Sequence, residues 1–184
     1  MVFNEHIRTA TGIVALCCGI GVAALHDDGT VFSTLGESSV THGDFVAVAC
    51  GPDHVVALRC DGFFCNWGSN YRSQREDRPT TSGFVAVSCG THHSVALHAD
   101  GSVTTWGTTD EGQRDDAPTG AVFVAVACGA GHSVALRGDG TVVVWGSNEY
   151  HQREPSAGVA DAPAGGGFVA IESGGGFRGA LCVG

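Results

Sequence analysis

Basic residues are scarce in this chain, and it holds a single methionine. Its 184 residues include only 9 Lys and Arg against 19 Asp and Glu, so the formal net charge is −10. An electrostatic field of that sign repels nucleic-acid phosphates and anionic lipid headgroups. The acidic residues are spread through predicted loops, which is typical of a solvated surface. We therefore expect neither a nucleic-acid-binding protein nor a membrane-surface protein.

A long hydrophobic run is also lacking. The most apolar stretch, residues 13–25 (IVALCCGIGVAAL), is too short to cross about 30 Å of hydrocarbon as a helix. The residues before it carry one Arg, one Glu and one His, which is unlike the basic flank of a signal peptide. We interpret the stretch as core and predict an intracellular, reducing compartment: cytoplasm, nucleus or organelle interior.

The eight cysteines show no metal-type CxxC spacing. The adjacent Cys17 and Cys18 make a poor disulfide pair. Cys60 and Cys65 flank a predicted turn and form the one plausible bridge. The other cysteines are expected to be free thiols.

Glycine, in contrast, is abundant, with 29 residues, and no helical period of useful length appears. This composition is typical of many short strands joined by tight turns. The length suits a single domain, residues 1–184.

One sequence pattern recurs through the chain. The motif FVAV begins at Phe45, Phe84 and Phe123, at intervals of 39 residues. A related IVAL begins at Ile13 and FVAI at Phe168. A fixed period of this size marks an array of supersecondary units. The predicted units are about 13–44, 45–83, 84–122, 123–167 and 168–184.

Each unit is predicted to be an antiparallel meander of at least three strands. The FVAV and HSVAL segments are short, apolar and rich in β-branched residues, which favours strands buried on both faces. An Asp-Gly pair between strands supplies a tight turn. Such small sheets must stack, and the Trp-Gly at the end of a unit favours radial stacking in a β-propeller. Trp67, Trp106 and Trp145 are the expected packing residues, with Leu35 at this place in the first unit.

The motif CGxxHSVAL…DGxVxxWGxN…GQ resembles the regulator of chromosome condensation repeat and covers the chain from about Ile13 to Val183. The resemblance implies an all-β fold, a propeller usually of about seven blades. Seven units of 39 would need about 273 residues, whereas this chain offers four complete hairpin units and a partial C-terminal one. Three readings stay open. The first is a closed five-bladed ring in which MVFNEH supplies a missing strand, and the second is an open arc completed by another chain or by a second copy of this one. A fragment is the third reading.

Metal, cofactor and catalytic sites are not predicted. Equivalent cysteines and histidines of successive units would form rings about a propeller axis, but Ser173 and Phe177 replace them in the fifth unit. No nucleophile, phosphate-loop or zinc-protease motif occurs. We assign structural roles to the repeated positions, which are Trp67, Trp106, Trp145, His54, His93, His132, Asp61, Gly62, Asp100, Gly101, Asp139 and Gly140.

The connectors after each Trp-Gly vary most between units. Loops carry specificity on rigid scaffolds, and Tyr and Arg are enriched at interface hot spots. The candidate partner-binding residues are Tyr71, Arg72, Arg75, Arg78, Asp110, Glu111, Asp115, Asp116, Tyr150 and His151.

The leading hypothesis is a non-enzymatic propeller that binds protein partners, as an adaptor or as a subunit of a larger assembly. A homodimer or hetero-complex that completes the ring is one form of it. The resemblance also suggests guanine-nucleotide exchange on a small GTPase, and inhibition of an enzyme as in a propeller-shaped β-lactamase inhibitor. The plant ultraviolet-B receptor is similar to this family and relies on clustered tryptophans at GWRHT-like positions. The matching positions of this chain read GTHHS and GAGHS, without tryptophan, so light sensing of that kind is not expected.

Overall fold

The computed structural model describes residues 12–35, 40–41, 43–110, 112–120, 122–147, 168–173 and 178–182. Strands and turns account for the regular structure of these residues, and none of them lies in a helix that could span a membrane. The strands of the first two units are β1 (Ile13–Cys18), β2 (Val22–His26), β3 (Val31–Ser33), β4 (Val40–Thr41), β5 (Phe45–Cys50), β6 (His54–Arg59) and β7 (Phe64–Gly68). Those of the later units are β8 (Phe84–Cys89), β9 (His93–His98), β10 (Val103–Gly107), β11 (Phe123–Cys128), β12 (His132–Arg137), β13 (Val142–Gly146), β14 (Phe168–Ser173) and β15 (Arg178–Cys182).

Each unit forms its own antiparallel sheet, and we refer to these sheets as blades 1 to 5. Blade 1 holds β1 to β4, and blades 2, 3 and 4 hold β5 to β7, β8 to β10 and β11 to β13. Blade 5 is the pair β14 and β15. Strands pair in sequence order, so blades 1 to 4 are meanders and blade 5 is a hairpin, as the four complete units and the partial C-terminal unit predict.

The Asp-Gly turns follow one design. In blade 2 the Gly62 N–H donates to the Arg59 carbonyl at 2.9 Å, and Gly62 has a φ of 79°. A Cβ is disfavoured at such a φ, which explains the glycine. The Asp61 carboxylate accepts the Phe63 N–H at 3.2 Å and orders the turn. The equivalent carboxylates of Asp28, Asp100 and Asp139 bind Thr30, Ser102 and Thr141, and these hydrogen bonds lower their pKa.

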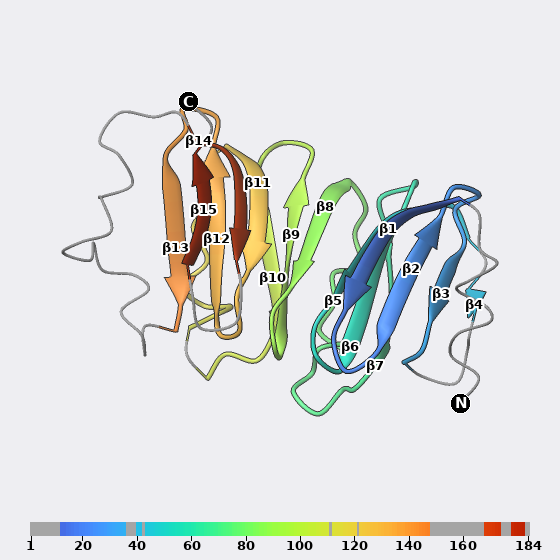
Figure 1. Cartoon of the computed structure of the whole chain (residues 1–184). Coiled ribbons are helices and arrows are strands. Elements are labelled where there is room, and N and C mark those ends of the chain that lie inside the picture. Colours follow the sequence, from blue (N-terminus) through green and yellow to red (C-terminus); the bar gives the residue numbers. More distant parts are fainter. Residues whose placement is uncertain are drawn as a thin grey trace.

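The hydrophobic core lies between blades rather than in a single centre. One cluster joins blades 1 and 2, with Leu25 and Val31 packed on Phe45 and Val55. Two further clusters join blade 2 to 3 and blade 3 to 4. The first strands of successive blades also contact one another, β1 with β5, β5 with β8, β8 with β11 and β11 with β14. The blades therefore stand side by side in an arc, with β3 and β4 near one end and β14 and β15 near the other (Figure 1).

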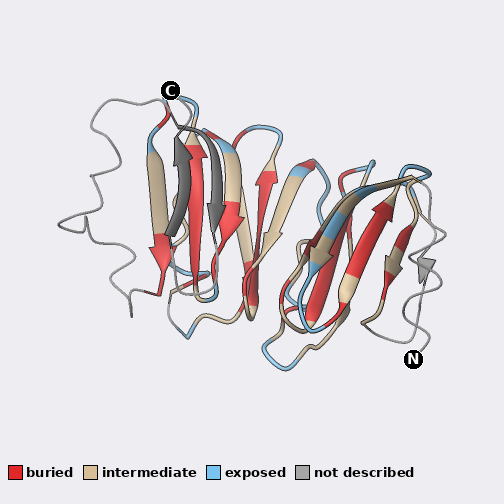
Figure 2. Ribbon diagram, viewed as in Figure 1, coloured by how far each residue is buried: buried red, intermediate tan, exposed pale blue. Residues whose placement is uncertain are grey.

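In blades 1 to 4 the second strand is buried on both faces, as predicted, but the first strand is not. A β-bulge after Phe45 shifts the register, so that Ala47 pairs with Leu58 and Val46 is left 56% exposed. The equivalent Val85 and Val124 are each 54% exposed. The expectation of full burial for FVAV is therefore wrong: the strand is the edge of its sheet, and the bulged residue is exposed. In Figure 2 the second strands are mostly red, whereas the first strands are mixed in colour.

Tryptophans fill the later junctions. Trp106 and Trp145 are each 1% exposed and lie in the clusters that join their blade to the preceding one. In blade 1 the register differs from expectation. Ala23 pairs with Ser33 as Val56 pairs with Asn66, so Thr34 and not Leu35 stands at the tryptophan position. Leu35 follows it and packs on the first cluster.

Closure of the arc into a ring is not seen among the described residues. The N-terminal segment MVFNEH, to which a closing strand was assigned, lies outside them. The described residues thus form successive propeller blades arranged side by side in an arc (Figure 1).

Candidate interaction surface

The connector between blades 2 and 3, residues 69–83, is fastened by a buried glutamine. Gln74 is fully buried, and its carbonyl accepts the indole N–H of Trp106 at 3.0 Å. Its side-chain oxygen accepts the Arg72 N–H at 2.7 Å. The Asn70 carboxamide oxygen accepts the backbone N–H of Arg75 at 3.0 Å. The connector is therefore an ordered loop that presents its outward side chains in fixed positions.

Two ion pairs join this connector to the next one, residues 108–122. Arg72 binds Asp110 at 2.6 Å, and Arg114 binds Asp77 at 3.2 Å. All four side chains are about half exposed, so each pair contributes little to stability. Each loop nevertheless supplies one arginine and one aspartate, so the two pairs together join the loops into one surface. We call this the connector surface and define it by Tyr71, Arg72, Asp77, Asp110 and Arg114.

Tyr71 is the most prominent residue of the connector surface. It is 81% exposed, and the Arg72 guanidinium lies 5.3 Å from its ring centroid. A phenol ring orders few torsions on binding and offers both apolar area and a hydroxyl group, which explains why tyrosine is common at interfaces. The salt-bridged Arg72 supports the ring from one side.

The other predicted arginines of this connector lie differently. Arg75 donates to the Gly68 carbonyl at 3.3 Å, and Arg78 donates to the Phe64 carbonyl at 3.3 Å. Both guanidinium groups therefore brace the connector against its own blade. Asp115 pairs with Arg114 at 3.4 Å, and Asp116 is exposed nearby. Glu111, Tyr150 and His151 lie outside the described residues.

The repeated histidines join neighbouring blades. His54 Nε2 lies 3.1 Å from Ser94 Oγ in the next blade, and His93 Nε2 lies 2.9 Å from Ser133 Oγ. His54, His93 and His132 are fully buried. Burial lowers the pKa of His54, and burial together with the nearby His54 and His132 lowers the pKa of His93 to about 4. His54 and His93 are therefore neutral at pH 7 and act as hydrogen-bonding groups.

The repeated cysteines end the first strands and lie at a common cavity. This cavity of about 490 Å³ is lined by the Cys-Gly residues of four successive units, which begin at Cys18, Cys50, Cys89 and Cys128. Burial raises the pKa of Cys89 and of Cys128 to about 12, so both remain thiols. No group of three or more His, Cys, Asp or Glu side chains in the described ranges is arranged to hold a metal ion.

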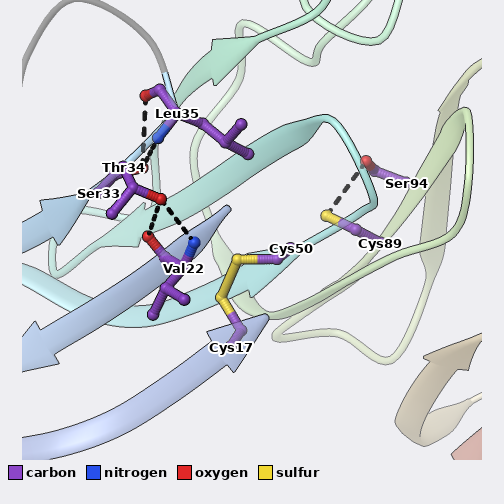
Figure 3. Close-up of a disulfide and its surroundings, with 8 residues drawn as sticks. All are labelled: Cys17, Val22, Ser33, Thr34, Leu35, Cys50, Cys89 and Ser94. Carbon is purple, nitrogen blue, oxygen red and sulfur yellow. Dashed lines mark hydrogen bonds between the residues drawn. A yellow bond between two sulfur atoms is a disulfide. The ribbon is translucent and has the colours of Figure 1, made fainter. Parts of the chain in front are cut away.

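The disulfide prediction is wrong. Cys17 of β1 is bonded to Cys50 of β5, whereas Cys60 and Cys65 are free (Figure 3). The hairpin register explains the second point, because Cys65 stands opposite Ala57 and Cys60 lies in the turn. The expectation of free thiols for the other cysteines fails for Cys17 and Cys50 and holds for Cys18, Cys89 and Cys128. Cys182 has no described side chain.

Sequence reasoning missed the acceptors and bridges between units. The carbonyls of Gln74 and Gln113 receive the indole N–H groups of Trp106 and Trp145, each at 3.0 Å. The recurrence of glutamine at the same 39-residue spacing was the available signal. Nothing in one unit's sequence pointed to a Cys17–Cys50 bond, because its two ends belong to different units.

The antiparallel meanders stack side by side, their first strands are in contact, and tryptophans pack between neighbouring blades. This arrangement defines a β-propeller repeat protein. The particular repeat is identified by a family model: the regulator of chromosome condensation (RCC1) repeat matches residues 84–113 and 123–152. These two segments of the chain are therefore RCC1-type repeats. Among curated proteins, none matches this sequence significantly.

Solved structures show the same fold. Prp20p from Saccharomyces cerevisiae is 20% identical, with a TM-score of 0.72 over 94% of this chain and 56% of its own. The ectodomain of the Physcomitrella patens receptor kinase CR4 is 21% identical, with a TM-score of 0.69 over 88% of this chain and 47% of its own. The computationally designed protein Ika4 is 21% identical, with a TM-score of 0.51 over 74% of this chain and 91% of its own. The chain thus spans about half the length of the two natural proteins.

Proposed function

We propose that this chain is a non-enzymatic interaction protein that binds a protein partner through its connector surface, as an adaptor or as an accessory subunit. The observation that carries the proposal is Tyr71, which is 81% exposed on a loop that Gln74 and two ion pairs hold in place. A large exposed aromatic side chain on a rigid support loses little entropy on binding. Prp20p, similar in fold, is described with binding properties to Gsp1p and histones.

The charge of the connector surface suggests the kind of partner. Arg72 and Arg114 are the basic groups of this surface, and each already pairs with an aspartate, so the surface is mixed and not cationic. With a net charge of −10 on the whole chain, a folded protein with aromatic and mixed polar contacts fits better than a nucleic acid. An intracellular, reducing location also belongs to this proposal.

The partner-capped arc is the form of the molecule that we favour. The chain spans 47% and 56% of the CR4 ectodomain and of Prp20p, so a second chain of similar size would match the length of a whole relative. A second copy of this chain and a different propeller chain are the two candidates. Light scattering of the purified chain distinguishes a self-association from a monomer of 18.7 kDa.

The proposal is tested by affinity purification from source cells with quantitative mass spectrometry. The test variant is Tyr71→Ala, and the matched control is Phe63→Ala, an aromatic residue that is 40% exposed in the hairpin turn between β6 and β7 and does not belong to the connector surface. We expect specific partners to be lost from the Tyr71 variant and kept by the control, with equal melting temperatures. Loss from both variants or from neither would contradict a role for the connector surface.

Guanine-nucleotide exchange is the alternative that the resemblance to the RCC1 repeat implies, and enzyme inhibition is a further one. Exchange would appear as faster release of labelled nucleotide from a Ran-type GTPase at micromolar concentrations of this protein. Our proposal predicts no acceleration. A clear acceleration would replace the adaptor assignment with that of an exchange factor.

A further inference from the structure

The junction between blades 1 and 2 differs from the other two described junctions in its polar contacts. Blades 2 and 3 are tied by His54 to Ser94 and by Trp106 to the Gln74 carbonyl. Blades 3 and 4 repeat both ties, with His93 to Ser133 and Trp145 to the Gln113 carbonyl.

Among the described residues of blades 1 and 2, neither tie is present. In blade 1 the turn GIG replaces the segment that carries the histidine, and in blade 2 Val55 stands where Ser94 and Ser133 stand later. The Trp67 indole N–H is buried and has no acceptor among the described residues. Instead, the Cys17–Cys50 disulfide joins the two blades (Figure 3).

The disulfide occupies a position that every junction shares. Cys50, Cys89 and Cys128 end the first strands of blades 2, 3 and 4. Cys17 corresponds to Ala49 and Ser88, the next-to-last residues of their strands. Between blades 3 and 4 this position carries a noncovalent contact, in which the Cys128 N–H donates to Ser88 Oγ at 3.0 Å. The disulfide between blades 1 and 2 therefore stands where a hydrogen bond joins blades 3 and 4.

The bond is also open to small molecules. Cys50 lines the cavity of about 490 Å³ that the Cys-Gly residues form, and the exposed Cys18 lies in the same lining. The cavity admits a small thiol, and the thiols of the half-buried Cys89 and the buried Cys128 do not compete in exchange because their pKa values are raised to about 12.

We propose that Cys17–Cys50 is a thiol-exchange site for low-molecular-weight thiols, and that its reduction loosens blade 1 from the rest of the arc. A thiolate attacks Cys50 Sγ from the cavity and forms a mixed disulfide, while the S–S bond breaks and Cys17 leaves as a thiolate that takes a proton from water. A second thiolate attacks the sulfur of the small thiol in the mixed disulfide. It forms the oxidised small-molecule disulfide and releases Cys50, so two thiols supply the two electrons.

Loosening follows from the missing ties. With the bond open, the hydrophobic cluster and backbone contacts such as the Ile20 N–H to the Pro52 carbonyl, at 2.6 Å, are what hold blade 1. A cross-link over 33 residues also limits the freedom of the opened blade, and reduction removes that limit. Blades 2 to 4 keep all their ties in either state.

The first test uses the full chain in mixtures of reduced and oxidised glutathione. Alkylation and peptide mass spectrometry should show Cys17 and Cys50 becoming labelled together as the proportion of reduced glutathione rises. Hydrogen exchange should accelerate at least about tenfold in β2 and remain unchanged in β9. Full alkylation of Cys17 and Cys50 in the oxidised protein would overturn the proposal, as would equal exchange in β2 before and after reduction, or the same acceleration in β9.

Two matched variants complete the test. Cys17→Ser should show fast exchange in β2 whether or not glutathione is added. Cys18→Ser, one residue away, should keep the response of the native protein. If the Cys18→Ser protein no longer responds to glutathione, the response depends on Cys18 and not on the Cys17–Cys50 bond alone, and the proposal is overturned. If Cys17→Ser does not fold, the titration of the native chain decides the question alone.

Discussion

Acid is expected to weaken the blade junctions through His93. This side chain is fully buried and lies 2.9 Å from Ser133 Oγ. Burial and the neighbouring histidines lower its pKa to about 4, against about 6.5 in an unfolded chain. A histidine with a lowered pKa in the folded state takes up its proton more readily when the chain unfolds. The stability that it contributes is therefore complete above about pH 6.5 and is lost as the pH falls toward 4.

The size of the loss follows from the two pKa values. Each pKa unit corresponds to about 1.4 kcal/mol, so His93 removes about 3 kcal/mol from the free energy of unfolding between pH 7 and pH 4. That is a large share of the stability of a small domain. His54, whose pKa is lowered by the same cause, shifts stability in the same direction.

Urea unfolding at pH 7 and pH 4, followed by circular dichroism, measures this loss in the native protein and in His93→Gln. Glutamine keeps a hydrogen-bonding group near Ser133 and does not titrate. Carboxylates titrate in both proteins, so their effect cancels in the difference. The native protein should lose about 3 kcal/mol more than the variant. Equal losses in the two proteins would refute the assignment of acid sensitivity to His93.

Three further predictions concern single positions. Trp145→Phe removes an indole N–H that donates to a connector carbonyl at 3.0 Å and should cost about 1–3 kcal/mol in urea unfolding, whereas an unchanged midpoint would contradict the tie. Gly62→Ala should cost about 1–3 kcal/mol, because φ is 79° and the new Cβ would lie 2.5 Å from a backbone nitrogen; Gly120→Ala, with φ of 71° and open space, should cost less in the same assay. In native protein N-ethylmaleimide should label the exposed Cys60 and leave Cys128 unlabelled until the chain unfolds; early labelling of Cys128 would contradict its burial.

The fold could be predicted from the sequence because the same pattern of turn residues and apolar segments recurs in each unit. The Asp-Gly turns and the alternation of short apolar runs fix the meander, and the 39-residue period fixes the stacking. The bulge at Val46 could not be predicted, because the FVAV segment is apolar at every position and carries no period. Only the partner strand shows which of its residues is left unpaired.

The connector surface was predicted in part. Tyr71 and Arg72 are exposed at the connector surface. The guanidinium groups of Arg75 and Arg78 instead donate hydrogen bonds to backbone carbonyls of their own blade. Sequence composition identifies a variable loop without showing the direction of its side chains. The Cys17–Cys50 bond was missed for a related reason, since it joins non-equivalent positions of two units, and only the packing of β1 on β5 brings them together.

The most direct test of the central claim is site-specific photo-cross-linking in source cells. A photo-reactive phenylalanine analogue is placed either at Tyr71 or at Phe63, and the adducts are identified by mass spectrometry. The account predicts a defined protein adduct from position 71 and none from position 63. Adducts from position 63 alone, or the same adducts from both positions, would contradict binding through the connector surface.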